Sequence, residues 1–473
     1  MSDGQSAAAG PARVAVVGAG PAGIFTADAL AKAPARVSVD LLERLPAPFG
    51  LVRYGVAPDH PRIKKIITAL HKLLDRGDIR LLSNVEVGRD LTVDDLLDLY
   101  DAVVLTTGAD RSAGLDVPGV DLPGSHGAAD FVAWYGGHPD APRGWPLDAE
   151  RVAVIGAGNV ALDVTRMLVR RAEDLAATDI PDTVAAGLAD SRVREVHVVA
   201  RRGPVQARFS PLELRELGEV PGVRVVVDLE DLQLDDASRR AVEADHQRAQ
   251  VLETLRGYAH PAAEEASPEQ AGEQAGEGPQ RTVHLHFLHR PVRLLGEDRV
   301  RGLQTERMQL VGNGTVTGTG RLHELAVDAV YRAVGYVSSP LPGVPFDEDA
   351  GVVPHDAGRV RGEDGRPVPG VYVSGWVKRG PVGLIGHTRS DAAETAASLL
   401  EDLPSLPRAP HRDPQDVTAL LRERGARAVE WSGWLLVDTY ERELGAAAGR
   451  ERTKVVDRED MLRAALGEAS GAS

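Results

Sequence analysis

Short apolar runs that end at glycine alternate with helical segments in the first part of the chain. Residues 13–18 form an apolar, β-branched run, which is typical of a buried parallel strand. An alanine-rich segment at 21–33 predicts a helix, and residues 36–43 predict a second strand. The three elements together predict one β-α-β unit.

The same order of elements recurs in the middle of the chain. Residues 151–156 predict a strand, 160–173 a helix and 195–200 the strand that closes a second β-α-β unit. The sequence therefore contains an internal repeat of two such units. Further strands are expected at 101–107, 282–291, 328–335 and 371–375, and a further helix at 390–402.

The remaining segments differ in composition. Residues 235–281 are polar and predict a polar helix followed by a flexible surface insert at about 262–280. Residues 404–414 are rich in proline and predict a linker. Residues 415–473 predict two or three helices, and residues 1–13 read as a disordered tail.

A glycine fingerprint lies between the first strand and the first helix, and Glu43 follows at the end of the second strand. In this pattern the glycines allow a tight turn, a close approach to a pyrophosphate and close packing of helix and strand, while the acid binds ribose hydroxyls. A glycine turn in an unrelated α/β protein is the alternative. The residues expected at the first dinucleotide are Gly18, Ala19, Gly20, Pro21, Ala22, Gly23 and Glu43.

The second copy is Gly156-Ala-Gly158-Asn-Val-Ala161, with alanine in place of the third glycine. The strand after it ends in Arg201 and Arg202 and carries no acid at its tip. An acid would repel a 2′-phosphate, whereas a guanidinium binds it with charge-assisted hydrogen bonds. The second unit should therefore prefer NADP(H), unless the two arginines are only a solvated basic turn.

Two dinucleotide units in one chain predict FAD and NADP(H) and a hydride relay between them. Two further segments fit the flavin half: the strand end at Gly108, and a second glycine-rich loop at 375–386. Trp376 in this loop could stack on an aromatic ring, or it could be a core residue of a simple turn.

Composition narrows the class of enzyme. The 473 residues include no cysteine, which excludes thiol-based disulfide reductases and cysteine-ligated clusters. The net charge of −16 argues against nucleic acid as a partner. No apolar run approaches the ~20 residues that span a bilayer, so we expect no membrane insertion and a cytoplasmic protein.

Six motifs in order along residues 12–403 resemble those of adrenodoxin reductase-like ferredoxin–NADP(+) reductases, above all the actinobacterial type. The motifs are at 18–23, 49–61, 158–163, 201–206, 212–216 and 375–381. The resemblance implies further FAD contacts at Leu51, Val87, Trp376, Gly383, Leu384 and Ile385. It implies NADP contacts at Ala157, Gly158, Asn159, Val160, Arg201, Arg202, Glu213 and Gly383.

The resemblance also implies a His–Glu couple near the nicotinamide and flavin rings, which maps to His60 and Glu216. By itself, His60 could belong to a simple turn before a basic helix. We expect the couple to orient the nicotinamide and adjust the charge beside it rather than to act as a general base. One departure concerns a family arginine, because Ala113 stands near its place and Arg111 is displaced.

These observations predict an α/β protein with two Rossmann-like three-layer dinucleotide-binding domains. The FAD-binding domain is discontinuous, at 12–110 and 336–403, with the NADP-binding domain inserted at 111–335. Residues 404–473 form a C-terminal linker and helical extension. Two chain crossings between the domains should limit hinge motion. No metal site is expected.

The function implied is transfer of a hydride from NADPH to FAD, then of single electrons to an acidic ferredoxin, which could supply a cytochrome P450. An NADPH-dependent flavin monooxygenase, a quinone reductase and a non-enzymatic redox sensor are the alternatives. We favour a monomer. The cations considered for ferredoxin docking are Arg201, Arg202, Arg208, Lys378 and Arg379, or the helix stripe Arg166, Arg170 and Arg171.

Overall fold

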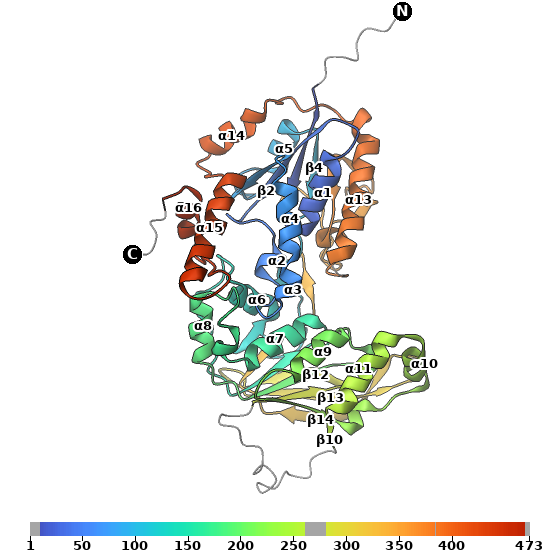
Figure 1. The fold of residues 1–473 in the computed structure, drawn as a ribbon. Helices are drawn as coiled ribbons and strands as arrows, with labels where there is room; N and C mark the ends of the chain where they lie inside the picture. The colour runs from blue at the N-terminus through green and yellow to red at the C-terminus, as the bar shows by residue number, and fades with distance from the viewer. Residues whose placement is uncertain (1–9, 261–280, 384, 469–473) are drawn as a thin grey trace, which may run out of the picture.

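The computed structural model describes residues 10–260, 281–383 and 385–468. Within these residues the chain forms two seven-stranded sheets, a three-stranded sheet and a two-stranded ribbon. The first sheet lies in the upper body of Figure 1 and the second sheet in the lower body. The predicted insert at 262–280 and Leu384 lie outside the described residues.

The first sheet has the order β17-β18-β19-β4-β1-β2-β3, and its last five strands are parallel. Alternate residues of β1 face opposite sides: Val14 and Val16 join one apolar core, and Ala15 and Val17 join another. The strands are β1 (Ala12–Val17), β2 (Val37–Glu43), β3 (Ile79–Ser83), β4 (Ala102–Leu105), β17 (His355–Asp356), β18 (Arg359–Arg361) and β19 (Pro367–Val373).

Helices cover both faces of the first sheet, because each of these cores contains helical residues. The core around Val14 includes α1, α4, α13, α15 and α16, and the core around Ala15 includes α5 and α14. Their bounds are α1 (Pro21–Ala31), α4 (Ile66–Leu74), α5 (Val93–Leu99), α13 (Ile385–Asp402), α14 (Pro414–Glu423), α15 (Trp431–Ala447) and α16 (Arg458–Ala465).

The second sheet is parallel throughout, in the order β10-β9-β11-β8-β7-β15-β6. Its strands are β6 (Ser125–Gly127), β7 (Arg151–Ile155), β8 (Glu195–Val199), β9 (Val223–Asp228), β10 (Ala259–His260), β11 (Arg281–His286) and β15 (Ala329–Arg332). Its helices are α6 (Ala128–Gly136), α7 (Asn159–Val169), α8 (Asp182–Ala189), α9 (Pro211–Gly218), α10 (Asp236–Ala244) and α11 (His246–Gly257).

The other face of the second sheet is covered by an antiparallel sheet of β12 (His289–Leu295), β13 (Gly302–Leu310) and β14 (Val316–Leu325). Leu294 and Leu303 of this sheet share a core with Ile155 of β7. The single strand expected at 282–291 is instead two strands, β11 and β12. Leu288 between them has a left-handed backbone with a φ of 61°. The expected helix at 160–173 ends earlier, at Val169.

The two crossings between the upper and lower bodies lie side by side. They pair as an antiparallel ribbon of β5 (Arg111–Ser112) and β16 (Tyr336–Val337). Arg111 also donates from Nη2 to the carbonyl of Ser338 at 2.9 Å, so it fastens one crossing to the other.

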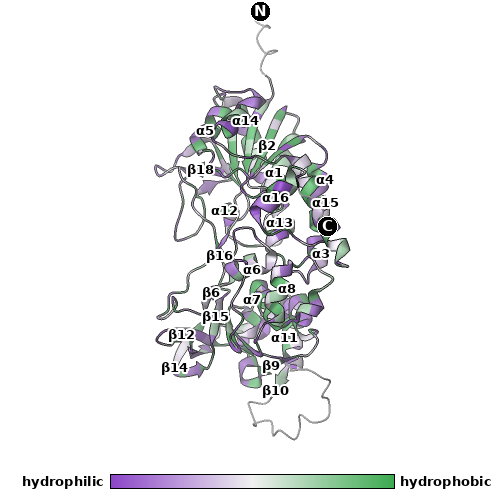
Figure 2. Cartoon of the chain, turned by 90° about the vertical axis from the view of Figure 1, so that its left-hand side faces the viewer, coloured by the Kyte–Doolittle hydropathy of each residue, from purple (hydrophilic) through white to green (hydrophobic). Residues whose placement is uncertain are grey.

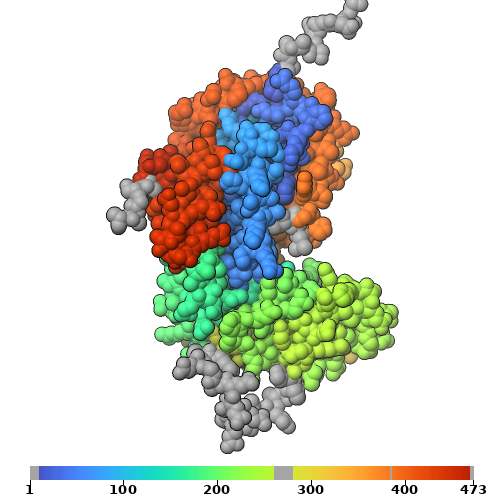
Figure 3. All heavy atoms as spheres, in the orientation of Figure 1, coloured from blue at the N-terminus to red at the C-terminus, as the bar shows by residue number. Residues whose placement is uncertain are grey.

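The C-terminal helices are part of the upper body and also touch the lower one. Val429 bridges to Ser83, so the segment before α15 extends the edge of the first sheet. Arg450 pairs with Asp182 of α8 at 2.7 Å, and the red C-terminal part adjoins the green lower body in Figure 3. The strands of the upper body are largely green, and therefore apolar, in Figure 2. No described helix is long and apolar enough to cross a membrane.

Candidate functional site

The turn between β1 and α1 is shaped by its glycines. A Cβ on Gly18, whose φ is 107°, would lie 2.7 Å from the carbonyl oxygen of Thr106, and a Cβ on Gly23 would lie 2.7 Å from Thr106 Oγ1. A Cβ on Gly20 would meet no atom closer than 4.0 Å, so its surroundings are open. This combination of crowded first and third positions and an open second one fits a bound pyrophosphate.

Glu43 ends β2 beside this turn and is buried. Its carboxylate accepts hydrogen bonds from the backbone N–H of Ala19 at 2.8 Å and of Leu45 at 3.0 Å. Burial raises the pKa of Glu43, against the effect of these two donors. The carboxylate is thus held at the edge of the sheet, where the ribose of a dinucleotide would follow the pyrophosphate. Its remaining lone pairs are available to accept hydrogen bonds from the ribose hydroxyl groups.

A second loop lies against the first turn, and the sequence pattern did not single out its conformation. Phe49 has a left-handed backbone with a φ of 84°, and its N–H donates to the carbonyl of Ala19 at 2.8 Å. A Cβ on Gly50 would lie 3.1 Å from the Cα of Gly20. Leu51 then opens the short helix α2 (Leu51–Tyr54), so it stands next to the turn.

The late glycine-rich loop also reaches this turn. Gly375 has a φ of 79°, and a Cβ there would lie 2.6 Å from the Cβ of Ala22. Trp376 begins α12 (Trp376–Arg379) and is half-buried. Gly383 also has a positive φ, of 88°. The first and last parts of the chain therefore converge on one place.

The remaining residues that the sequence predicts as FAD contacts lie after strands or near the late glycine-rich loop. Val87 is buried in the core beyond β3, and Gly108 follows β4 with a φ of 78°. Ile385 is the first residue of α13, and Leu384 is outside the described residues.

The turn between β7 and α7 repeats the pattern. A Cβ on Gly156 would lie 2.9 Å from the carbonyl carbon of Ala333, whereas a Cβ on Gly158 would meet nothing within 4 Å. Gly158 caps α7 without a side-chain hydrogen bond, so the first N–H groups of the helix are free to bind an anion. Arg201 and Arg202 follow β8, and neither side chain has an ion pair or hydrogen bond within the described residues.

His60 lies in the seam between the two bodies, just before α3 (Pro61–Lys64). Its Nε2 lies 3.2 Å from Asp163 of α7 and 3.0 Å from Glu213 of α9, and its Nδ1 lies 3.4 Å from Glu216. Burial alone would lower the pKa of His60, but the hydrogen bonds with Asp163 and Glu213 outweigh it and raise the pKa to about 10. Burial raises the pKa of Glu216. The structure thus brings His60, Glu213 and Glu216 together.

Arg166 is the centre of this seam network, and its expected place on a docking surface is wrong. Its guanidinium is fully buried, pairs with Asp59 at 2.8 Å, Asp163 at 2.6 Å and Glu213 at 2.7 Å, and contacts His60. Arg170 also pairs with Asp59, at 2.9 Å. Arg166 and Arg170 have the spacing of a stripe along one helix face, but that face packs against the upper body instead of facing solvent.

Lys378 is likewise unsuitable for docking. Only 3% of its side chain is exposed, and its Nζ pairs with Asp391 at 2.9 Å and with Glu394 at 2.5 Å. Asp391 also accepts from the N–H of Gly375, so Lys378 supports the late glycine-rich loop from within.

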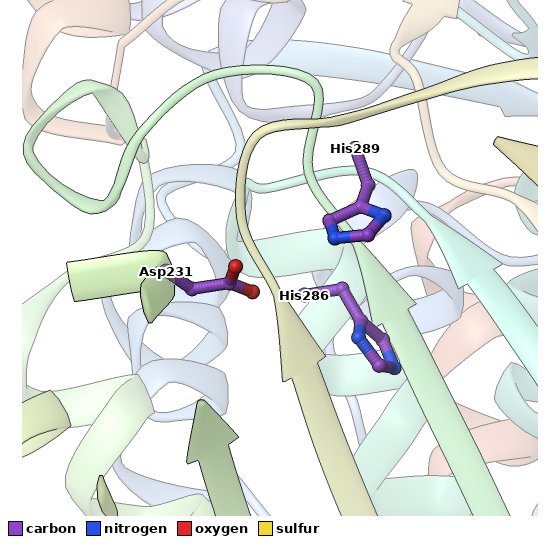
Figure 4. Close-up of side chains that lie close together, drawn as sticks. All are labelled: Asp231, His286 and His289. Carbon is purple, nitrogen blue, oxygen red and sulfur yellow. The ribbon is translucent and has the colours of Figure 1, made fainter. Parts of the chain in front are cut away.

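A separate cluster of metal-binding residue types lies where β11 ends and β12 begins, and there Asp231, His286 and His289 lie close together (Figure 4). Arg307 contacts two of these residues: its Nη1 contacts Asp231 and lies 3.1 Å from both His289 Nε2 and the carbonyl of Phe287. Because a guanidinium already neutralises the carboxylate and donates to the imidazole, we assign no metal to this cluster.

Comparison with known proteins places this geometry in a family. The family described as Pyridine nucleotide-disulphide oxidoreductase matches residues 12–228. The NADPH-ferredoxin reductase FprA of Mycobacterium tuberculosis is 39% identical, with 97% of this chain and 100% of that protein covered. The chain belongs to the adrenodoxin reductase-like family of ferredoxin–NADP(+) reductases.

A further relative and a solved structure agree with this family. The mitochondrial NADPH:adrenodoxin oxidoreductase of Bos taurus is 40% identical, with 95% of this chain and 91% of that protein covered. The solved structure of Mycobacterium tuberculosis FprA in complex with NADPH has a TM-score of 0.86, at 37% identity, over 97% of this chain and 100% of that one. The predicted fold class and family are confirmed. The wider family is described by disulphide oxidoreduction, but this sequence has no cysteine and so has no thiols for that reaction.

Proposed function

We propose that the chain transfers electrons from NADPH through FAD to a ferredoxin-type iron–sulfur protein. The observation that carries this proposal is the difference between its two glycine turns. One turn stands beside a buried acid, Glu43, and the other precedes the strand β8, which Arg201 and Arg202 follow. Relatives with reductase activity in their names match nearly the whole chain.

On the flavin side, the open surroundings of Gly20 admit the pyrophosphate of FAD, and the carboxylate of Glu43 accepts hydrogen bonds from the ribose hydroxyl groups. Bound FAD supplies chemistry that side chains lack, because it takes up two electrons as a hydride and gives them up one at a time. The loops at Leu51 and Trp376 lie against the first turn, which supports their assignment as flavin contacts.

On the nicotinamide side, the N-terminus of α7 binds the pyrophosphate of NADPH, and Arg201 and Arg202 bind the 2′-phosphate. Hydrogen bonds from a guanidinium to a phosphate are charge-assisted and paired, which gives preference for NADPH over NADH.

The seam residues set the charge and position of the nicotinamide. We assign His60 a proton on each ring nitrogen, with Nδ1–H directed at Glu216 and Nε2–H at Asp163 and Glu213, because ionised carboxylates only accept hydrogen bonds and the pKa of His60 is raised to about 10. His60 comes from the upper body and the three acids come from the lower one, so the network also fixes the distance between the two dinucleotide sites.

For the partner we propose an acidic ferredoxin, and for the protein a cytoplasmic monomer. With Arg166 and Lys378 buried, exposed arginines outside the nucleotide site, such as Arg171, are the remaining candidates for contact with an acidic surface. Light scattering on the purified protein tests the oligomeric state.

Anaerobic stopped-flow reduction of the purified yellow protein tests the proposed function. The flavin absorbance should bleach rapidly with NADPH, much more slowly with NADH, and return when an oxidised ferredoxin is added. Replacing Arg201 and Arg202 with glutamine should remove most of the difference between the two nucleotides.

Each other outcome contradicts a different part of the proposal. A colourless protein that cannot be reconstituted with FAD contradicts the flavin assignment. Equal rates with both nucleotides would mean that Arg201 and Arg202 form only a basic turn. Bleaching that oxygen or a quinone reverses, but no ferredoxin does, would favour a monooxygenase or quinone reductase.

A further inference from the structure

A segment after β8 is fastened to the second glycine turn through its backbone. The N–H of Arg208 donates to the carbonyl of Ala157 at 2.7 Å, and the N–H of Ser210 donates to Asn159 Oδ1 at 2.8 Å. Residues 208–210 are therefore fixed beside the first residues of α7. The guanidinium of Arg208 takes no part in this attachment.

The side chain of Arg208 is exposed and has no ion pair or hydrogen bond to the described part of the chain. Other arginines near the seam differ, since Arg166 and Arg170 both pair with Asp59. A free guanidinium beside an open turn is available to a ligand, and no acid has to be displaced first.

The position of Arg208 distinguishes it from Arg201 and Arg202. Those two follow the end of β8, where the ribose and its 2′-phosphate lie in this class of fold. The backbone of Arg208 is hydrogen-bonded to Ala157, the residue that precedes the helix cap Gly158. The pyrophosphate of a dinucleotide lies at that cap.

We propose that Arg208 is a third phosphate-binding arginine of this site and binds the pyrophosphate that NADPH and NADH share. The inference rests on the proposed function, because it assigns a further contact within the nicotinamide site. Arg208 then contributes to affinity for both nucleotides, whereas Arg201 and Arg202 contribute to the choice between them.

Equilibrium binding of NADP⁺ and NAD⁺ to the FAD-loaded protein tests this assignment, with calorimetry as the readout. Arg208→Gln should weaken the binding of both nucleotides by a similar factor, on the order of tenfold for one charged hydrogen-bonding group. Arg202→Gln should weaken NADP⁺ alone. Arg36→Gln is the control for a general loss of positive charge, because Arg36 is an exposed arginine of the upper body with no ion pair or hydrogen bond from its side chain to the residues that the structure describes.

Three results would overturn the inference, and a fourth would overturn the proposed function with it. Unchanged affinity of Arg208→Gln for both nucleotides removes the contact. Weaker binding of NADP⁺ alone would mean that Arg208 binds the 2′-phosphate instead of the pyrophosphate. Slower ferredoxin reduction at unchanged nucleotide affinity assigns Arg208 to a docking surface. If the unaltered protein binds no NADP⁺, the nicotinamide site itself is refuted, which distinguishes that failure from the other three.

Discussion

Replacing Glu441 with glutamine should destabilise the protein strongly, although this residue is remote from both glycine turns in sequence. Glu441 of α15 is fully buried and pairs with Arg53 of α2 at 2.5 Å. It also pairs with Arg452 at 3.1 Å and accepts from the N–H of Val455 at 3.0 Å. One carboxylate therefore joins the C-terminal segment to α2, the helix that follows the loop at Phe49 and Gly50.

The magnitude follows from what remains after the change. Arg53 keeps its charge with only 3% of its side chain exposed, and the glutamine amide directs N–H groups at one of its former donors. Loss of one partner from a buried ion pair costs about 3–5 kcal/mol. For a domain of this size the corresponding fall in Tm is on the order of 10 °C.

Thermal unfolding followed by circular dichroism and by release of flavin fluorescence measures this change. Asp460→Asn is the matched control, because Asp460 pairs with Arg463 in α16 with about half of each side chain exposed, and such pairs contribute about 0–1 kcal/mol. If Glu441→Gln lowers Tm no more than Asp460→Asn does, the reasoning on the buried pair is refuted.

Three further predictions concern the first turn and the seam. Gly23→Ala should yield protein with little bound flavin, because a Cβ there collides with Gly18 and Thr106, whereas Gly144→Ala, with open space around it, should keep full flavin absorbance. The pKa of His60 is raised to about 10, so its contribution to stability is complete below about pH 6.5 and is lost as the pH rises to 10; His60→Gln should remove this decline from urea midpoints measured against pH. Burial lowers the pKa of Lys454 to about 7, so stability should rise from pH 7 towards ~10.4 through this residue, and Lys454→Met should remove the rise. A His60→Gln or Lys454→Met profile parallel to that of the unaltered protein would contradict the corresponding assignment.

The sequence predicts the two turns well because their physics is local. A strand, a glycine turn and a helix N-terminus follow one another within a few residues, so the spacing of Gly18, Gly20 and Gly23 carries the information. The same holds for Arg201 and Arg202, which directly follow a strand. These features agree with the confirmed fold class and family.

The seam network could not be predicted from the sequence, because its members come from separate segments. Asp59 and Arg166 are buried together only when the two bodies pack, and in the sequence each looks like an ordinary surface charge. An arginine stripe on a helix has the same spacing whether it faces solvent or another body. The left-handed backbone of Phe49 was also hidden, since its contacts come from distant segments: its N–H donates to the carbonyl of Ala19, and its ring centroid lies 5.7 Å from that of Trp434.

The strand β19 pairs with β4, although all of the second sheet lies between them in the sequence. During synthesis the strands β6 to β15 are therefore available to pair before β19 leaves the ribosome. The nicotinamide half can close on itself first, while β4 waits with an apolar, unpaired edge. A nascent chain interrupted before residue 367 should then be a folded nucleotide-binding body attached to an aggregation-prone flavin half, which chaperones would have to protect until the last parallel strand arrives.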